Sequence, residues 1–303
     1  MNGFAVQSIY ELQQTSKFVS LLKAANALHK TIERWDFVRW FLGIFLAILA
    51  IIGIFLPEIR GPLGASGFVV GILTTAAWPR WRQCLSSDAA VVQEMFDTEL
   101  FGLEWSRSQP AEKNNVFISR WARKRFRRNT APWYVDVRRI PSPVAEALCQ
   151  RENAIWDADL RSAWVILCKT TFWVLTVVLI LIGVALDLSV WHFFLWIVFP
   201  LTSLLGTVLS NTYQQSATVA GRRSILANIE LELKQLHPSS SVAEINSFAL
   251  NLRGWQDDIF RSRLATARVP SWFHALLRDK NETDHAYEVE AFRAKWGAAY
   301  PET

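Results

Sequence analysis

The sequence is poor in the residues that build disulfide frameworks and metal centres. It has only three cysteines and five histidines among 303 residues. Cys84, Cys149 and Cys168 are odd in number and widely spaced, which excludes a disulfide framework and the paired spacing of a zinc site. The histidines are scattered, without a His-x-x-x-His pair. We therefore expect no metal, no disulfide and a reducing environment.

Motifs of common enzymes are missing as well. The chain has no Gly-rich phosphate-binding loop and no Gly-x-Ser-x-Gly nucleophile motif. Asp157 and Asp159 are two residues apart on a predicted helix, where their side chains point to different faces, so they make no catalytic carboxylate pair. The long apolar runs lack the carboxylates that proton pumps carry. We predict that the protein is not an enzyme, that it has no catalytic residue, and that it needs no cofactor.

What the sequence does contain is four long apolar runs. The two clearest are residues 163–186 and 190–209, separated by little more than Asp187. An earlier pair covers residues 37–56 and 63–78. A helix rises about 1.5 Å per residue, so about 20 apolar residues cross the roughly 30 Å hydrocarbon core of a bilayer. The sequence therefore predicts an all-α membrane protein with four transmembrane helices in two hairpins.

The distribution of positive charge predicts the orientation in the membrane. Residues 1–39 hold five Lys and Arg, residues 80–162 hold fourteen, and residues 210–303 hold eleven. The two short connections within the pairs hold only Arg60. Because positively charged segments stay on the cytoplasmic side, we expect both termini and the middle segment in the cytoplasm. Tryptophans flank the runs at the depth of lipid headgroups: Trp35, Trp40, Trp78, Trp81, Trp164 and Trp191.

The predicted cytosolic segments, 1–36, 80–162 and 210–303, have helical patterns. Residues 8–35 repeat apolar side chains at three- and four-residue steps, which predicts one amphipathic helix. Its apolar stripe either packs on the rest of the cytosolic region or lies on the membrane surface, and both alternatives stay open here. The stripe contains Phe18, Leu21, Leu22, Ala25, Leu28, Ile32 and Trp35.

Further helix starts are visible in the two longer cytosolic segments. Asp88 is a candidate N-cap. The Ser-Pro pair at 142–143 opens a helix that we expect to run without a break into the third apolar run. Residues 212–236 continue the fourth run as a helix, with apolar residues on one side. Ser241-x-x-Glu244 is a capping-box pattern that predicts another helix, ending near residue 255.

A basic stretch interleaved with aromatic residues lies in the middle segment. Six of the nine residues from 120 to 128 are Lys or Arg, and the pair at 133–134 is Trp-Tyr. Such side chains suit a nucleotide-like ligand, because cations bind phosphate and aromatic faces stack on bases. They also suit a juxtamembrane face in contact with acidic lipid or solvent. The candidate ligand-binding residues are Arg120, Arg123, Lys124, Arg127, Arg128, Trp133 and Tyr134.

Polar residues inside the apolar runs are candidates for a pathway through the membrane. Ser203, Thr207 and Ser210 share one helix face in the fourth run and either pack against neighbouring helices or line a wet pore. They are the candidate pore-lining residues. Lys169 in the third run either reaches the headgroups with its long side chain or acts as a pore-lining or gating charge.

One predicted helix concentrates polar residues just before the third apolar run. These residues suit a ligand pocket, and they equally suit a structural cluster, since Asp157 lies four residues before Arg161 on the same helix face. The residues are Gln150, Asn153, Trp156, Asp157 and Arg161.

Several segments, in order and spacing, resemble one family: the four-transmembrane pore-forming effectors found beside cyclic-oligonucleotide synthases in bacterial antiphage systems. The stretch CysGlnArgGluAsnAlaIleTrpAspAlaAspLeuArg at 149–161 is the most telling. The resemblance covers nearly the whole chain, although His29 replaces an expected aromatic residue. The other matching stretches lie at 13–27, 93–105, 133–134, 256–263 and 269–273.

The resemblance implies an antiphage membrane effector that stays silent until a cyclic nucleotide second messenger binds its cytosolic region. The ligand would be a cyclic di- or oligonucleotide and no DNA or RNA polymer. Activation would open a pore in the lipid bilayer of the bacterial inner membrane, or disrupt it, and cause growth arrest or cell death. Four crossings make a poor pore alone, so a homo-oligomer is expected.

Two other classes of function stay open from the sequence. The protein is alternatively a membrane-anchored interaction or signalling protein without pore activity. A small ion channel or transporter is the third class, although a transporter would need a substrate site near the midplane of the membrane.

Overall fold

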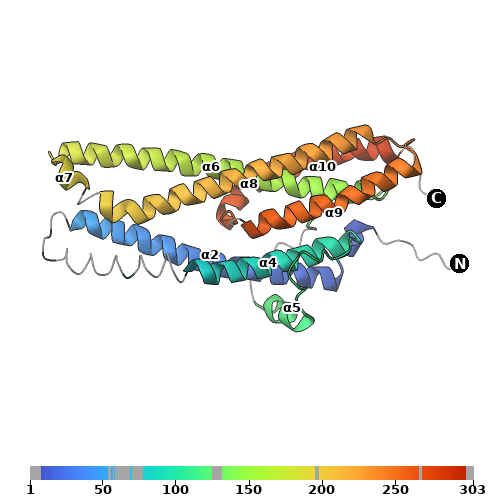
Figure 1. Ribbon diagram of the computed structural model, residues 1–303, viewed down its shortest axis with the longest axis horizontal. Helices are drawn as coiled ribbons and strands as arrows, with labels where there is room; N and C mark the ends of the chain where they lie inside the picture. The colour runs from blue at the N-terminus through green and yellow to red at the C-terminus, as the bar shows by residue number, and fades with distance from the viewer. Residues whose placement is uncertain are drawn as a thin grey trace. The chain divides into compact units, whose positions relative to one another are not determined.

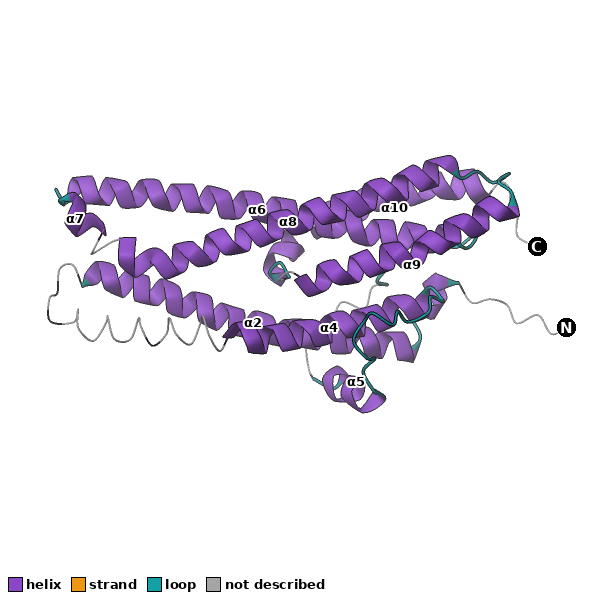
Figure 2. Cartoon of the chain, in the orientation of Figure 1, coloured by secondary structure: helices purple, strands orange, loops and turns teal. Residues whose placement is uncertain are grey.

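The computed structural model describes residues 8–53, 78–124, 132–194, 198–265 and 268–297, with the single residues 56, 58 and 69. These residues form helices joined by turns and loops, without a strand (Figures 1 and 2). The expected all-α class is thus confirmed for the described residues. The helices are α1 (Ile9–Leu12), α2 (Ser16–Ile52), α4 (Trp78–Leu100), α5 (Asn115–Ala122), α6 (Val144–Ala185), α7 (Val190–Phe193), α8 (Phe199–Gln235), α9 (Val242–Ala265) and α10 (Ser271–Gly297).

The chain divides into two compact units. Unit 1 combines Met1–Lys30, Ser86–Arg161 and Thr218–Thr303, and unit 2 combines Thr31–Leu85 and Ser162–Ala217. Helices α2, α4, α6 and α8 each contribute residues to both units. The division into cytosolic and membrane segments stays a prediction, because contacts within the chain do not locate a bilayer.

The N-terminal part of unit 1 contains a break that the helical pattern does not predict. The expectation of one helix over residues 8–35 is wrong, since α1 ends at Leu12 and α2 begins at Ser16. Gln13 lies in the break and is buried. Its Oε1 accepts hydrogen bonds from the backbone N–H groups of Trp133 and Tyr134 at 2.8 and 2.9 Å, and its Nε2 donates to Tyr134 O at 3.0 Å. A partner 120 residues away therefore interrupts the helix.

The apolar stripe of α2 is buried inside unit 1. Phe18, Leu21, Leu22 and Leu28 are each at most 6% exposed. The ring of Phe18 meets that of Phe96 in α4 edge-on, with centroids 5.6 Å apart. From Phe18 to Leu28 the structure therefore shows the first alternative, packing onto the rest of unit 1, whereas Trp35 at the end of the stripe is 50% exposed and belongs to unit 2.

Helix α4 is longer than the sequence pattern suggests. The helix start expected at Asp88 is wrong, because the described helix already begins at Trp78. Between Trp78 and Asp88 the helix contains one proline, Pro79, and this lies in the first turn of α4, where proline is tolerated. Asp88 pairs instead with Lys113, with Oδ1 and Nζ 2.6 Å apart. It thereby holds the segment that leads into α5.

The two expected long helices are present. Helix α6 runs from Val144 to Ala185 without a break, as the Ser-Pro start predicts, and α8 continues to Gln235. On α8, Ile225, Ile229 and Leu233 are each at most 5% exposed. The apolar side predicted for this helix therefore faces the core of unit 1.

The capping box before α9 is present as predicted. Glu244 N donates to Ser241 Oγ at 3.3 Å, and Ser241 N donates to the Glu244 carboxylate at 2.7 Å. The end expected near residue 255 is wrong, since α9 continues to Ala265. The reason is packing: Phe260, 3% exposed, joins the core cluster that includes Val91 of α4.

In unit 2, a four-residue connection joins α6 to α7. A Cβ atom on Gly183 would lie 2.6 Å from a ring carbon of Phe193, so this close approach requires glycine. Asp187 takes a left-handed conformation with φ 49°, which aspartate tolerates better than most residues. The fourth expected crossing is described as α7 and the start of α8, and residues 195–197 lie outside the described part.

Three of the predicted interface tryptophans meet in unit 2. The ring centroids of Trp78 and Trp81 are 5.2 Å apart. The ring centroid of Trp35 lies 6.1 Å from that of Trp78 and 5.9 Å from that of Trp81. Next to these tryptophans in sequence, Arg82 Nε donates to both carboxylate oxygens of Asp36, each at 3.2 Å. Aromatic clusters with adjacent charges are typical of the membrane interface.

Helix α6 has the properties of a membrane span. Among the described residues, it is the one helix that is long and apolar enough to cross a bilayer. Little of its apolar stretch is buried. Ile166, Trp173, Leu181 and Val184 are all more than 60% exposed. Such a surface is unfavourable in water and suits lipid. The second expected crossing, residues 63–78, lies almost wholly outside the described residues, so four crossings stay a prediction.

Candidate functional site

The first half of the basic stretch lies at the end of α5. Arg120 is in the last turn of this helix, and Arg123 and Lys124 follow it. All three are exposed, as a phosphate-binding or lipid-binding role requires. The remaining two candidates, Arg127 and Arg128, lie outside the described residues.

Lys124 already has an aromatic partner. Its Nζ lies 3.3 Å from the centroid of the Trp121 ring, a cation–π contact. Partial burial lowers the pKa of this ammonium group. Among the described cations of this stretch, Arg120 and Arg123 are therefore more open to an external anion than Lys124.

The two aromatic candidates occupy different surroundings. Trp133 is 37% exposed, whereas Tyr134 is only 3% exposed. The Tyr134 ring packs against Phe96 and Phe101, with centroids 6.2 and 5.4 Å away. Its hydroxyl donates to Asp97 Oδ1 at 2.7 Å, and burial followed by the charge of Asp97 raises its pKa well above the usual range. Stacking of a base on Tyr134 would require this packing to open, so Trp133 is the more accessible of the two candidate rings.

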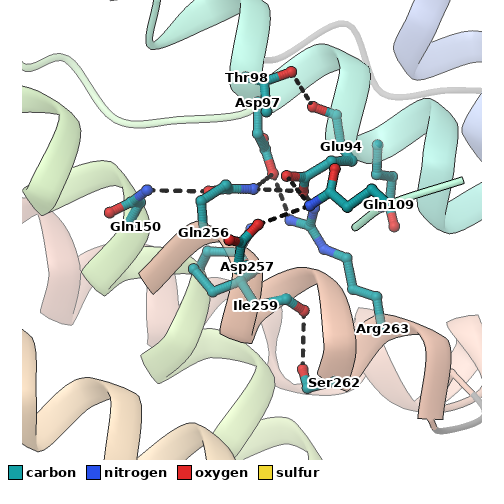
Figure 3. A network of polar contacts seen from close by, with 12 residues as sticks. Glu94, Asp97, Thr98, Gln109, Gln150, Gln256, Asp257, Ile259, Ser262 and Arg263 are labelled. Carbon is teal, nitrogen blue, oxygen red and sulfur yellow. Dashed lines mark hydrogen bonds and ion pairs between the residues drawn. The ribbon is translucent and has the colours of Figure 1, made fainter. Parts of the chain in front are cut away.

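A network of buried charges joins α4 to α9 within unit 1 (Figure 3). Glu94 and Asp97 of α4 are at most 1% exposed. Arg253 Nη2 lies 2.7 Å from Glu94 Oε1, and Arg263 Nη2 lies 2.6 Å from Asp97 Oδ2. Gln256 Nε2 donates to both carboxylates, at 2.7 and 3.2 Å. Each buried carboxylate thus has an arginine and an amide partner.

The same network reaches α6 and the loop before α5. Gln150 Nε2 of α6 donates to Gln256 Oε1 at 3.1 Å and to Leu252 O at 3.0 Å. Gln109 Nε2 donates to Glu94 at 3.1 Å and to Asp257 at 3.0 Å. Three helices and one loop therefore share a single set of polar contacts.

The charges of this network strongly influence one another. Burial raises the pKa of Glu94, although Arg263 acts in the opposite direction. Burial acts to lower the pKa of Arg263, but Asp97, Tyr134 and Glu94 outweigh it and raise that pKa. Removing one member of a buried ion pair costs about 3–5 kcal/mol, because its partner stays buried without compensation. The network therefore fixes α9 against α4.

A second buried cluster joins α6 to α8. Asp157 Oδ1 lies 2.9 Å from Arg161 Nε, and Asp157 Oδ2 accepts from Arg222 Nε at 2.9 Å. Arg161 and Arg222 are 4% and 1% exposed. Burial acts to raise the pKa of Asp157, but both arginines outweigh it and lower that pKa below its usual range. Of the two alternatives for the polar residues before the third apolar run, a ligand pocket or a structural cluster, this geometry fits the structural cluster.

The other polar residues before the third run also have partners within unit 1. Asn153 Nδ2 donates to the Tyr134 hydroxyl at 3.4 Å. The Trp156 ring stacks on His274 with centroids 5.7 Å apart. Together with the bonds of Gln150, these contacts account for the polar residues of α6 as parts of the folded unit.

A shallow groove of about 420 Å³ lies where α6, α8 and α10 meet in unit 1. Arg151 lines it and pairs with Glu230, with Nη2 and Oε1 2.8 Å apart. Lys295 also lines it and donates to Leu236 O at 3.3 Å. Lys234 adds a third cation to the lining. The groove therefore carries positive charge at a place separate in sequence from the basic stretch.

The candidate pore-lining residues all lie on α8. Ser210 is exposed, and its Oγ accepts from Gln214 Nε2 at 3.3 Å. The side chains of Ser203 and Thr207 lie outside the described part. Lys169 on α6 is exposed.

Sequence reasoning missed most members of the two buried clusters. Arg222 follows Thr218 by four residues and precedes Ile225 by three, so it occupies a core position of the apolar stripe of α8. Glu94 and Asp97 interrupt the apolar stripe of α4 in the same way. The sequence did contain one signal for these residues: a charged side chain at a position where the regular apolar pattern places a core residue indicates a buried charge.

The described residues contain no group of three or more His, Cys, Asp or Glu side chains placed to hold a metal ion. Their cysteines are all free thiols, and Cys149 is buried.

Comparison with known proteins gives one match. No curated protein and no solved structure matches the chain. A family model, described as the SMODS-associating 4TM effector domain, matches residues 7–292. This range contains every described helix except the last turn of α10. The name fits the all-helical fold and the membrane-like surface of α6. The chain belongs to the family of SMODS-associating 4TM effector domains.

Proposed function

We propose that the protein is an antiphage-defence effector of the bacterial inner membrane, gated by a cyclic nucleotide second messenger. In this proposal unit 1 is cytosolic and binds the nucleotide, and unit 2 spans the bilayer. Binding opens a pore or disrupts the membrane, which arrests growth or kills the cell. The effector domain performs no catalysis in this scheme, and both chain termini are cytoplasmic.

The observation that carries the proposal is the pairing of α6 with α8. The ion pairs Asp157–Arg222 and Arg151–Glu230 fasten these two helices to each other within unit 1. Both helices then continue into the third and fourth predicted crossings. A ligand that favours a different α6–α8 packing therefore has a direct path to the membrane segments. It shifts the equilibrium only by the difference between its affinities for the two packings.

The proposed ligand contacts are cations for phosphate and a ring for the base. Arg120 and Arg123 are exposed near Trp133 in sequence, and Arg127 and Arg128 extend the same stretch. Arginine suits this task, because its planar guanidinium donates two parallel hydrogen bonds to a phosphate. A cyclic di- or oligonucleotide offers at least two phosphates to such a stretch.

The proposed pore requires several copies of the chain. Four helices cannot enclose a wide aqueous channel, so we propose a homo-oligomer in which α8 lines the opening. Ser203, Thr207 and Ser210 recur on one face of α8 at steps of four and three residues. Small hydroxyl side chains at such steps can line water in the open state and pack closely in the closed state.

The test is dye leakage from liposomes that contain the purified full-length protein, against a panel of cyclic di- and trinucleotides. Leakage with one nucleotide supports gating and identifies the ligand. Binding without leakage favours a membrane-anchored signalling protein. No binding to any member contradicts nucleotide gating.

The ligand site is tested separately from the pore. Replacing Arg123 and Arg127 with Gln should abolish nucleotide binding and leave the fold intact, while Lys234→Gln in the groove is the matched control. Loss of binding in the control alone would move the site to the groove. Thr207→Leu should block leakage and leave nucleotide affinity unchanged, and normal leakage would remove Thr207 from the pore.

A further inference from the structure

The first turns of α10 expose apolar residues on one face. Trp272 is 54% exposed and Leu276 is 72% exposed, and Ala275 lies exposed between them. These positions are three and four residues apart, so they form one continuous patch on the helix. On the other side of the segment, Val269 and Phe273 are buried at 4% and 9% exposure. The segment is thus fixed to unit 1 by one apolar face and presents a second one outward.

Two contacts fix where this segment lies within unit 1. Lys30 Nζ donates to Ser271 Oγ, and the ring of Trp156 stacks on that of His274 at an interplanar angle of 24°. Lys30 belongs to α2 and Trp156 to α6. The start of α10 is therefore held by the two helices that lead into the first and third predicted crossings.

Both contacts give the same depth relative to the predicted membrane. The first crossing is predicted to begin at residue 37, seven residues after Lys30, and the third at residue 163, seven residues after Trp156. Seven helical residues span about 10 Å. The headgroup layer extends about 5–8 Å beyond the hydrocarbon core on each side, and a Trp side chain covers the remaining few ångströms. Two independent helices thus place the patch at the edge of the headgroup layer.

We propose that Trp272 and Leu276 dock into the cytoplasmic leaflet and hold the start of α10 on the membrane surface. Tryptophan is enriched at this depth because its ring is apolar and its N–H is polar. Lys30, which donates to Ser271, adds positive charge next to the patch, and Arg268 adds another, four residues before Trp272 in sequence. Positive charge favours the anionic lipids of the inner leaflet. An apolar patch flanked by cations is the pattern of an interfacial helix. The proposal depends on the predicted inner ends of the crossings and is independent of ligand gating and of the pore.

The experiment measures how deeply a nitroxide label at position 276 lies in the bilayer. The full chain carries Leu276→Cys in a Cys84→Ser, Cys168→Ala background and is reconstituted into nanodiscs with anionic lipid. Cys149 is retained, because it is 0% exposed and burial raises its thiol pKa well above the usual value, which suppresses labelling. Collision rates with oxygen, which concentrates in lipid, are compared with those of a water-soluble nickel chelate.

The matched control is Leu250→Cys on α9, where the leucine is 80% exposed. We expect the oxygen-to-nickel accessibility ratio at position 276 to exceed that at position 250 several-fold, with Trp272→Cys giving the same result. Equal ratios at 276 and 250 would overturn the proposal. Protection of position 276 from both reagents would also overturn it, because a second copy of the chain would then cover the patch.

Discussion

The two units of this chain differ in which side chains they bury and which they expose. Unit 1 buries charges, and arginines pair with the carboxylates of its two charge clusters, as at Asp97 and Asp157. The α6 segment of unit 2 exposes large apolar side chains such as Trp173 and Val184. The same helix, α6, has paired charges before residue 162 and an apolar surface after it.

This difference shows that the two halves of α6 are adapted to different solvents. In water, burying a charge is tolerated only with a partner, and exposing a large apolar surface is unfavourable. In lipid, an outward apolar surface is the stable arrangement, because every backbone polar group is satisfied within the helix. The change occurs between Arg161, which is 4% exposed, and Ile166, which is 66% exposed. From this contrast we predict which substitutions should be harmful in unit 1 and which in unit 2.

The largest effect is expected from breaking the charge cluster between α6 and α8. Asp157→Asn leaves the buried guanidinium groups of Arg161 and Arg222 without a counter-charge, which costs about 3–5 kcal/mol. The midpoint of thermal unfolding in detergent should fall by roughly 10 °C. Asp159→Asn, at an exposed position on the same helix, is the control and should shift it by no more than about 1–2 °C. Equal shifts in the two variants would show that the cluster does not stabilise the fold.

A second pair of variants compares exposed apolar residues in the two units. Val174, in the middle of the third predicted crossing, is 56% exposed, and Leu250 in unit 1 is 80% exposed. Val174→Asp should impair membrane insertion by about 2.5–3.5 kcal/mol. Leu250→Asp should change stability by less than about 0.5 kcal/mol. The measurement is the membrane-inserted fraction after expression, and comparable loss in both variants would contradict the contrast between the units.

The sequence predicts the features that depend on local pattern. The apolar run of α6, the capping box at Ser241 and the apolar side of α8 all follow from spacing along the chain, and the structure contains them. The break at Gln13 could not be predicted, because its hydrogen-bond partners lie 120 and 121 residues away. The helix start at Asp88 was wrong for a related reason, since its carboxylate binds Lys113 across a loop.

The candidate site was predictable only in part. Composition alone indicates the basic stretch, and the structure places Arg120 and Arg123 on the surface. Composition does not distinguish Trp133 from Tyr134, because burial of the second ring depends on Phe96 and Phe101 from another segment. The partners of Arg222 and Arg263 could not be predicted for the same reason: periodicity can place Arg222 on the buried side of α8, but it does not show which carboxylate on a distant helix pairs with it.

The smallest predicted effect concerns Glu152, a carboxyl group of unit 1 that pairs with no arginine among the described residues. Glu152 Oε2 accepts a hydrogen bond from Val135 N at 3.2 Å, and burial raises its pKa from 4.5 to about 7. Because the folded state binds this proton more tightly than the unfolded state, Glu152 destabilises the fold as pH rises from about 4.5 through 7. The loss of folding free energy by pH 8 is about 1–2 kcal/mol, reduced by the remaining solvent contact of the side chain.

Glu152→Gln keeps an acceptor for Val135 and removes the titration, so the midpoint of thermal unfolding of this variant should fall less than that of the wild type between pH 5 and pH 8. The same pH dependence in both proteins would assign it to other buried carboxyls, Glu94 and Glu146, whose pKa values burial also raises.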